Sequence, residues 1–332
     1  MIAPCPPLVT IGITAFNAQD TIARAIDSAF AQDWPNVEVV IVDDCSTDLT
    51  ANWLDEVARS GSNVRLVKHS QNLGVGAARN TILSQARGEY VVFFDDDDES
   101  LPHRITCQIA RLTGYEATQP RDTLVICHSA RRQIFPNGFQ RIEPTMGEET
   151  AHPAPQGVGV VKRILTGKTL HGGYGSLATC SQLARRSTYE RVGGFDPRLR
   201  RGEDTDLSIR LGIAGAHFVG VAEPLVVQHM TLASEKTLTM ELSAALVVLR
   251  KHRGQFGSER ELKFSEEWLG LKFDWISGRQ TQFLFGIVKS ILQYPIFTVA
   301  RLIYAVPMAS SRISQRMLYR PGPFRGGALG AP

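Results

Sequence analysis

The sequence predicts an α/β fold: a Rossmann-like, mostly parallel sheet flanked by helices, followed by a helical, amphipathic C-terminal extension. Three observations support this prediction. Over roughly the first third of the chain, apolar β-branched runs alternate with segments of helical periodicity. The runs are apolar almost throughout, which is typical of strands covered on both faces. Three of them end in polar clusters, and a parallel sheet places such ends along one edge, where its ligands bind.

The strands and helices of this part follow one another regularly. Four short apolar runs are the expected strands: Leu8–Thr14, Val37–Val42, Val64–Lys68 and Tyr90–Phe94. Three segments with one apolar face are the expected helices between them: Thr21–Gln32, the segment that ends at Gly61, and Gly74–Arg87. Because short polar side chains favour helix N-termini, Asp20 or Thr21 is expected to cap the first helix and Ser46 or Thr47 the second.

Regularity weakens between residues 118 and 179 and then returns. The expected elements are, in order, a strand at Thr123–Ser129, a turn at Pro136–Gly138, a Pro- and Gly-rich loop at 152–159, a helix at Asp204–Ala214 and a strand at Leu225–Gln228. Gly215 ends the helix, and the last strand leads directly to His229.

Charge is unevenly spread along a chain of ordinary globular composition. The 332 residues are 43% hydrophobic and 21% charged, with a net charge of +3. No acidic residue follows Asp274, whereas seven cations do. A mildly acidic body with a basic, apolar C-terminal part favours an anionic membrane surface as a partner and disfavours nucleic acid.

The cysteines and the N-terminus indicate a cellular compartment. Five cysteines lie far apart, without the CxxC spacing of metal or redox sites, as is typical of reduced thiols in a cytoplasm. The N-terminal segment lacks the basic and long apolar regions of a signal peptide. We therefore expect a cytoplasmic protein, peripheral on the cytoplasmic face of the inner membrane if its C-terminal part binds lipid.

The polar clusters at the strand ends carry the main functional signal. The three runs are followed by Thr14–Asn17, by Asp43–Asp44 and by the acidic run Asp95–Glu99. Neighbouring carboxylates repel one another and raise one another's pKa unless a cation compensates them. Mg²⁺ and Mn²⁺ prefer carboxylate and phosphate oxygens. We therefore expect a divalent cation that also holds a phosphate-bearing substrate; a solvated acidic turn is the simpler alternative.

The arrangement within the acidic run can also be predicted. In an extended segment, alternate side chains point the same way, so Asp95 and Asp97 are expected on one side and Asp96 and Asp98 on the other. Two other kinds of site are excluded. A calcium EF-hand needs a glycine at its sixth position and a pair of helices, and a dinucleotide-binding loop needs GxGxxG directly after the first strand. The sequence meets neither requirement.

Five segments together resemble the inverting glycosyltransferases of family 2, which have the GT-A fold. They are "VTIGITAFNAQDTIARAIDSAFAQ", "VEVVIVDDCSTD", "NLGVGAARNTIL", "GEYVVFFDDDDESLP" and "GGFDPRLRRGEDTDLSIRLGIAG", and their order and spacing fit from about Val9 to His229. The resemblance implies transfer of a hexosyl or N-acetylhexosaminyl group from a nucleoside-diphosphate sugar, UDP-sugar first, to a carbohydrate or lipid-linked glycan. It places the enzyme in the synthesis of cell-surface polysaccharide, lipopolysaccharide or glycolipid.

The resemblance also implies a division of the chain. The glycosyltransferase domain is expected over residues 1–235, with a nucleotide-sugar half at about 8–117 and an acceptor half at about 118–235. A helical, membrane-associated region is expected over 236–310, and a basic tail without fixed structure over 311–332.

Individual residues receive roles from the same resemblance. The nucleotide-sugar-binding residues that it implies are Thr14, Phe16, Asn17, Asp43, Asp44, Arg79, Asp95 and Asp96. Thr14 and Phe16 line the nucleoside pocket, Asp44 bonds the base edge and Arg79 lies near the base and the phosphates. Phe16 stands where the family often has tyrosine, so a hydroxyl contact is missing. A surface ion pair is the simpler role for Arg79.

The resemblance implies a metal site and a catalytic base as well. The metal ligands are Asp97, Asp95 and His229, with Mn²⁺ or Mg²⁺ as the cofactor. Four consecutive aspartates fit the motif in registers one residue apart, so Asp95 or Asp96 faces the ribose. Asp204 is the first choice for the base, beside Glu203. A carboxylate there can accept the proton of the acceptor hydroxyl, and a helix N-terminus keeps it ionised. Simple helix capping, and for His229 a plain strand end, are the alternatives.

The C-terminal segment Gln280–Val306 is apolar but interrupted. A membrane-spanning helix needs about 20 apolar residues, and Lys289, Pro295 and Arg301 break this segment. We expect an amphipathic segment that lies in the membrane interface. A spanning helix and a helical pair packed on the catalytic domain are the alternatives.

Three rival functions follow from the same residues. A sugar nucleotidyltransferase needs a glycine-rich, arginine-bearing loop after the first strand, and a phosphatase of the haloacid dehalogenase type needs DxDx(T/V) there; "TAFNAQD" supplies neither. The rival from another class is a catalytically inactive protein that binds nucleotide sugars or carbohydrate. The presence of both a candidate base and a metal motif argues against it.

Overall fold

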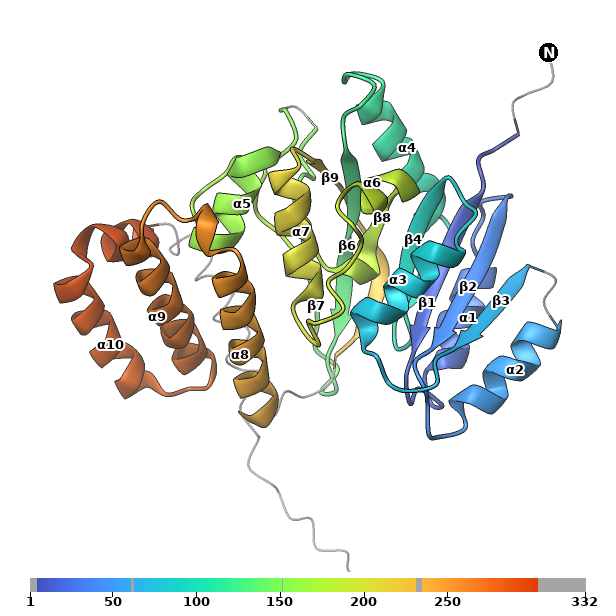
Figure 1. Ribbon diagram of the computed structural model, residues 1–332, viewed down its shortest axis with the longest axis horizontal. Helices are drawn as coiled ribbons and strands as arrows, with labels where there is room; N and C mark the ends of the chain where they lie inside the picture. The colour runs from blue at the N-terminus through green and yellow to red at the C-terminus, as the bar shows by residue number, and fades with distance from the viewer. Residues whose placement is uncertain (1–4, 61–62, 151, 231–234, 304–332) are drawn as a thin grey trace, which may run out of the picture. The chain divides into compact units, whose positions relative to one another are not determined.

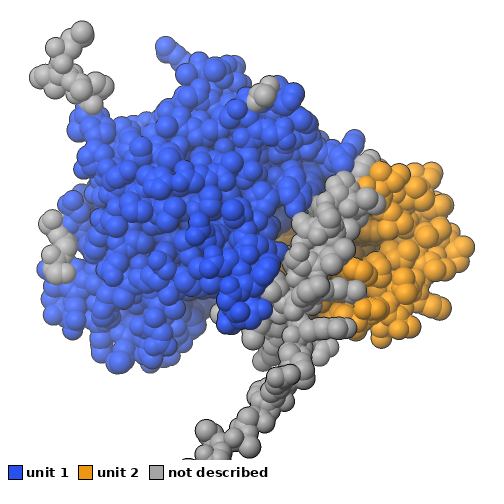
Figure 2. Space-filling view, turned by 180° about the vertical axis from the view of Figure 1, so that it is seen from behind, with its two compact units in different colours: residues 1–230 blue, residues 231–332 orange. Residues whose placement is uncertain are grey.

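The computed structural model describes residues 5–60, 63–150, 152–230 and 235–303. The chain divides into two units, residues 1–230 and residues 231–332, which are coloured separately in Figure 2. The first unit contains a nine-stranded sheet with helices on both faces, and the second unit is helical (Figure 1).

The parallel half of the sheet consists of the four strands that the sequence predicts. They are β1 (Val9–Ala15), β2 (Val37–Asp43), β3 (Val64–Lys68) and β4 (Tyr90–Asp95), paired in the order β3-β2-β1-β4. Each boundary lies within one residue of its predicted place. The prediction holds because uninterrupted apolar runs have no stable position other than a sheet covered on both faces.

Alternate side chains of these strands enter two apolar layers. Val39 and Ile41 pack into the layer with α1 (Ile22–Phe30), α2 (Thr50–Ser60) and α4 (Arg104–Glu116). Val40 and Val42 enter the opposite layer, which contains α3 (Val75–Gln85), α5 (Gly157–Thr166), α6 (Arg186–Arg191) and α7 (Glu203–Ile213). This period of two follows from strand geometry and fixes which strand residues can reach the edge of the sheet.

Thr21 occupies the N-cap position of α1, as predicted, but its hydroxyl donates to the Ala18 carbonyl and makes no capping hydrogen bond. The predicted caps of the second helix, Ser46 and Thr47, are wrong. Helix α2 begins at Thr50, and the Asp48 carboxylate accepts the Thr50 amide at 3.0 Å. The side chains expected to cap α2 instead contact the loop after β1, so a local propensity is overridden by a contact between distant segments.

The second half of the sheet is mixed, so the sheet as a whole is less parallel than its first strands suggest. Its strands are β5 (Glu99–Ser100), β6 (Val125–Ile134), β7 (Gln140–Glu143), β8 (Gln182–Arg185) and β9 (His217–His229). Strand β8 runs antiparallel to both β4 and β6, whereas β9 runs parallel to β6. The strand predicted at Thr123–Ser129 overlaps β6, which begins at Val125, and the strand predicted at Leu225–Gln228 lies within β9. The predicted turn at Pro136–Gly138 joins β6 to β7, with Gly138 at φ 80°.

The second unit contains α8 (Glu235–Lys251), α9 (Glu259–Ile276) and α10 (Gln280–Gln293), and residues 295–303 are helical too. Ser258 caps α9 by accepting the Glu261 amide at 3.1 Å. Tyr294 separates α10 from the next helical stretch. Within the described ranges, no helix combines the length and apolar character needed to cross a bilayer. The tail predicted over 311–332 lies outside the described residues.

Candidate active site

The ends of three parallel strands meet at one edge of the sheet, as predicted. In the register of β1, Thr14 lies beside Asp95 of β4, and Ala15 lies beside Asp43 of β2. The Phe16 amide donates to the Asp96 carboxylate at 3.0 Å, which ties the loop after β1 to the acidic run. Thr14, Asp43 and Asp95 therefore stand at the same level of the sheet.

Asn17 and Asp43 hold the loop after β2. Asn17 has a left-handed backbone (φ 52°), and its side-chain oxygen accepts the Thr47 amide at 2.8 Å. The Asn17 amide donates to the Ser46 hydroxyl at 3.0 Å, and the Ser46 amide donates to Asp43 at 3.0 Å. These contacts explain why Ser46 and Thr47 do not cap α2. They also give Asn17 and Asp43 a positioning role at this edge.

Asp44 is buried and joins the end of β2 to the loop before α3. Its carboxylate accepts the amides of Leu73 and Gly74 at 2.8 and 2.7 Å, and His69 Nδ1 lies at 2.7 Å. His69 is not among the site residues predicted from the sequence. Its position directly after β3 could have revealed it, because the end of β3 belongs to the same edge. The predicted contact of Asp44 with a nucleotide base stays a prediction.

Arg79 connects two motifs that are far apart in the sequence. It is buried on α3, and its guanidinium binds Asp95 at 3.0 Å and Glu203 at 2.7 Å. Burial alone would lower the pKa of Arg79, but the carboxylates of Asp95 and Glu203 raise it. Phe195 packs against the guanidinium at 5.4 Å from its ring centre. Arg79 therefore pairs with acids of the site itself, and its predicted contact with the phosphates stays a prediction.

The acidic run is a turn, so the predicted alternation of its side chains is wrong. After β4 the chain turns at Asp96 and Asp97, and the Asp98 amide lies 3.4 Å from the Asp95 carbonyl. The turn brings Asp98 back beside Asp95. The carboxylate oxygens of these two residues and the Cys180 sulfur lie within 4.8 Å of one another. An extended segment would have separated Asp95 from Asp98.

The carboxyl groups of this turn are held at an electrostatic cost. Burial, and then the neighbouring charges of Asp95 and Asp97, raise the pKa of Asp96 to about 7, although the Phe16 amide lowers it. Burial and the same two carboxylates raise the pKa of Asp98 as well. Asp98 is 5% exposed, and among the described residues no side chain donates a hydrogen bond to its carboxylate, although the Arg131 charge and the His229 backbone lower its pKa. A buried carboxylate beside two other carboxylates is costly, which favours a cation at this position.

The donor chemistry of this cluster fits a hard divalent cation. Asp95 and Asp98 offer carboxylate oxygens, the ligands that Mn²⁺ and Mg²⁺ prefer. Asp97 lies near enough to Asp95 for burial and that charge to raise its pKa, while Arg24 and His229 lower it. His229 ends β9, and its Nε2 lies 2.8 Å from Glu99. The structure thus gathers Asp98 with Asp95, and the assignment of Asp97 and His229 as ligands stays a prediction.

A buried cation lies near the acidic run, and no sequence pattern indicates it. Arg104, at the start of α4, is fully buried and donates to the Ser100 hydroxyl at 2.8 Å and to the Phe93 carbonyl at 3.1 Å. Burial lowers the pKa of Arg104 to about 10, although the Asp95 and Asp98 charges oppose this. In the sequence it reads as an ordinary residue in the first turn of a helix.

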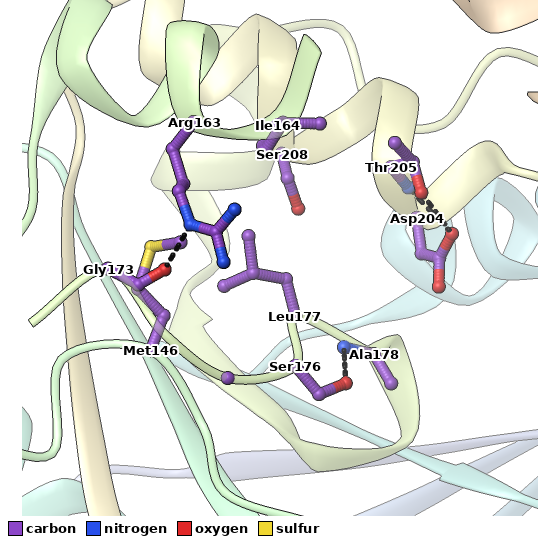
Figure 3. Close-up of a pocket in the computed structure, with 11 residues that line it drawn as sticks. Met146, Arg163, Ile164, Gly173, Ser176, Leu177, Ala178, Asp204, Thr205 and Ser208 are labelled. Carbon is purple, nitrogen blue, oxygen red and sulfur yellow. Dashed lines mark hydrogen bonds between the residues drawn. The ribbon is translucent and has the colours of Figure 1, made fainter. Parts of the chain in front are cut away.

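Glu203 and Asp204 begin α7 but face different surroundings. Glu203 is buried against Arg79, and burial raises its pKa. Asp204 is half-buried and lines a cavity of about 290 Å³, shown in Figure 3. Its carboxylate accepts the Thr205 amide at 2.6 Å. One carboxylate is thus committed to an ion pair, and the other faces open space.

Known proteins are similar to this chain both in sequence and in fold. The profile described as "Glycosyl transferase family 2" matches residues 10–156. The amylovoran biosynthesis glycosyltransferase AmsB of Erwinia amylovora is 30% identical over 225 residues, which cover 67% of this chain and 69% of AmsB. The chain belongs to glycosyltransferase family 2.

A further relative matches a shorter stretch of the chain. The succinoglycan biosynthesis protein ExoO of Rhizobium meliloti (strain 1021) is 44% identical over 118 residues, but the match spans only 36% of this chain and 33% of ExoO.

Solved structures show the GT-A fold. TarS 1–349 of S. aureus, in complex with UDP-GlcNAc, has a TM-score of 0.59 at 17% identity, covering 94% of this chain and 90% of that one. The mannosyltransferase PcManGT of Pyrobaculum calidifontis, in complex with GDP-Man and Mn²⁺, has a TM-score of 0.57 at 16% identity, covering 95% and 85%.

Proposed function

We propose that this glycosyltransferase moves a hexosyl or N-acetylhexosaminyl group from a UDP-sugar to a hydroxyl of a glycan acceptor, with inversion and with a divalent metal. The observation that carries the proposal is the pair of contacts made by Arg79. It holds the acidic run and the start of α7 together, so the donor residues and the candidate base belong to one site. The complexes of TarS with UDP-GlcNAc and of PcManGT with GDP-Man and Mn²⁺ support the choice of donor and metal.

The donor would lie along the edge formed by β1, β2 and β4. Phe16 is 45% exposed there, which leaves its ring available to stack on a nucleoside base. Asp44 is fixed by two amides and His69 and offers an ordered carboxylate to the base edge. Asp95 and Asp96 stand between this surface and α7, where the ribose and the diphosphate would lie.

Asp95, Asp97, Asp98 and His229 are the residues available to hold Mn²⁺ or Mg²⁺. When bound, such an ion offsets the negative charge that grows on a departing diphosphate. Two arginines of the protein hold the carboxylates of this site. Arg104 lies beneath the carboxylates, and Arg79 anchors Asp95 from the side. The positive charges of Arg104 and Arg79 lower the repulsion within the acidic run.

Asp204 is proposed as the base rather than Glu203. The Glu203 carboxylate is engaged by Arg79, whereas Asp204 faces the cavity. The Asp204 carboxylate takes the proton of the acceptor hydroxyl while the hydroxyl oxygen forms a bond to the anomeric carbon. The bond from that carbon to the diphosphate oxygen breaks, and its electron pair leaves with the nucleoside diphosphate. Attack from the side opposite to the leaving group inverts the anomeric centre.

The deciding experiment measures transfer or hydrolysis of radiolabelled UDP-sugars with Mn²⁺ or Mg²⁺, with and without a chelator. We expect turnover in the wild type, its loss with chelator and its loss in Asp204→Asn. UDP binding without any turnover in the wild type would favour an inactive nucleotide-sugar-binding protein. Turnover that survives both changes would contradict the mechanism.

The C-terminal unit supports a place at an anionic membrane surface, where a lipid-linked glycan would be met. Its large exposed apolar side chains recur every three or four residues: Leu284, Phe285, Val288, Ile291, Leu292, Ile296, Val299 and Ile303. Lys289 lies among them, and the sequence has no acid beyond Asp274. Apolar side chains flanked by cations suit the interface of a bilayer that contains anionic lipid. Polysaccharide biosynthesis, named for AmsB and ExoO, is the pathway class that we propose.

A further inference from the structure

The cavity beside Asp204 has a distinctive composition. It lies between α5, α7 and the segment 173–178. Figure 3 shows Asp204 on one side and the guanidinium of Arg163 on the other, with Leu177 between them. Within the part of the chain that the structure describes, Arg163 is the one cation that lines this cavity. The cavity therefore has a negative end and a positive end.

Arg163 is held in place at the positive end. It extends from α5, and its Nε donates to the Gly173 carbonyl at 3.0 Å. This contact fixes the plane of the guanidinium against the cavity wall. A planar guanidinium presents its N–H donors in a fixed fork, and the bond to Gly173 engages Nε. Arginine in this position is suited to a carboxylate or a phosphate, which it can bind with two parallel hydrogen bonds.

Ser208 provides an independent indication of a ligand. It lies on α7 one turn after Asp204, and its side chain is fully buried. Its hydroxyl has no hydrogen-bond partner, and in Figure 3 it points into the cavity. A buried hydroxyl normally finds a partner, because leaving one unpaired costs free energy. A polar group of a bound ligand would satisfy it.

We propose that this cavity binds an anionic group of the acceptor, a carboxylate or a phosphate, through Arg163 and Ser208. The inference rests on the proposed function, since it takes Asp204 as the base. Charge sets the orientation of the acceptor. Its anionic group is attracted to Arg163 and repelled by Asp204, so the hydroxyl that attacks is turned towards Asp204. The apolar side chains of Ile164 and Leu177 line the space between and suit the less polar face of a sugar ring.

The test uses the full-length protein with saturating UDP and Mg²⁺, so that the donor site cannot take up the probes. Glucuronic acid and glucose 6-phosphate are titrated by calorimetry, with glucose as the neutral match. The two anions separate a carboxylate from a phosphate as the group recognised. We expect the wild type to bind at least one anion about tenfold more tightly than glucose, because hydrogen bonds to a charged group are stronger than those to a neutral one.

Three variants and a control sharpen the result. Arg163→Gln should weaken binding of the anion about tenfold and leave binding of glucose unchanged, whereas Arg163→Lys should retain part of the preference. Ser208→Ala removes a hydroxyl that has no partner, so it should keep its stability and lose several-fold in affinity. Ser129→Ala is the matched control, because the Ser129 hydroxyl is also buried and unpartnered but lies on β6, outside the cavity.

Several outcomes would overturn the inference. Glucose bound as tightly as both anions, no binding of either anion by the wild type, or unchanged affinity in both Arg163→Gln and Ser208→Ala would each do so. Stabilisation of the wild type by UDP with Mg²⁺ is measured separately by thermal shift. If UDP with Mg²⁺ stabilises the wild type but neither anion binds, this inference alone is contradicted. If UDP with Mg²⁺ does not stabilise the wild type, the proposed function is contradicted as well.

Discussion

The two units of the chain use their cations in opposite ways. Residues 1–230 hold 22 Lys and Arg against 26 Asp and Glu, and the guanidinium groups of Arg79, Arg104 and Arg131 are buried. Residues 231–332 hold 14 against 7, and α10 exposes apolar side chains. In the first unit, buried cations organise a cluster of carboxylates. In the second unit, the exposed Lys289 lies among exposed apolar side chains of α10, an arrangement that suits the anionic membrane surface proposed above.

The largest effect on activity is expected at Asp204, whose carboxylate faces the cavity of the first unit. Asp204→Asn should lower the rate of sugar transfer about 10²–10⁴-fold, because the amide cannot accept a proton from the acceptor hydroxyl. Turnover of a radiolabelled UDP-sugar measures it. Asp122→Asn, an exposed site in the same unit, is the control and should leave the rate unchanged. Equal rates in both variants would remove Asp204 from the mechanism.

A buried ion pair of the first unit should matter far more than an exposed pair of the second. Arg79→Met leaves Asp95 and Glu203 buried without their cation, so the free energy of unfolding should fall by about 3–5 kcal/mol. Urea denaturation measures the loss. Arg250→Met, which breaks an exposed pair with Glu266, is the control and should not change the midpoint. Similar losses in the two variants would show that Arg79 does not organise the site.

Much of this first unit is predictable from the sequence, because its strands are uninterrupted apolar runs and the ends of parallel strands must meet. The missing parts depend on contacts between distant segments. Cys180 lies beside Asp95 and Asp98 because the strand that follows it, β8, pairs with β4, and the aspartates themselves do not reveal this. Arg104 looks ordinary in the sequence. It donates to the backbone of Phe93 on β4 and Gln182 on β8, so only the fold assigns it to the site.

The interior of the first unit should also make its stability sensitive to acid. His128 is fully buried on β6. Burial, and then the charges of Arg131 and Arg104, lower the pKa of His128 to about 3, although a backbone contact with Leu177 opposes this. Between about pH 6.5 and 3 the unfolded chain therefore binds a proton that the folded protein does not, and stability falls as the pH falls.

Comparison of a variant with the wild type isolates this contribution. In the wild type, His128 should lower the free energy of unfolding by about 2 kcal/mol between pH 6.5 and pH 5, because each pH unit contributes about 1.4 kcal/mol. His128→Leu should lack this decrease. Urea titrations at the two pH values measure it. The exposed His152→Leu serves as the control and should follow the wild type. If His128→Leu also followed the wild type, another group would be responsible for the acid sensitivity.

The smallest effect should come from the surface of the second unit. Phe285 and Leu292 on α10 are 79% and 81% exposed. Because burial of such a side chain contributes about 1.5–3 kcal/mol, each change to Ser should weaken binding to vesicles with anionic phosphatidylglycerol about tenfold or more. Lys289→Gln should weaken the free energy of vesicle binding by a smaller amount, about 1 kcal/mol, and high salt should abolish this difference. Vesicle flotation measures all three.

The matched control for that surface comes from the first unit. Leu49 and Ile142 are also large, apolar and exposed, at 65% and 58%, so exposure alone would make them equally sensitive to substitution. Leu49→Ser and Ile142→Ser should leave vesicle binding unchanged, because the first unit lacks the excess of cations. Equal losses from both units would mean that any exposed apolar side chain suffices. The apolar surface of α10 can bind either a membrane or a second copy of the chain, and only the anionic lipid requires the cations. A change of oligomeric state in Phe285→Ser, with vesicle binding intact, would therefore identify a second copy as the partner of α10.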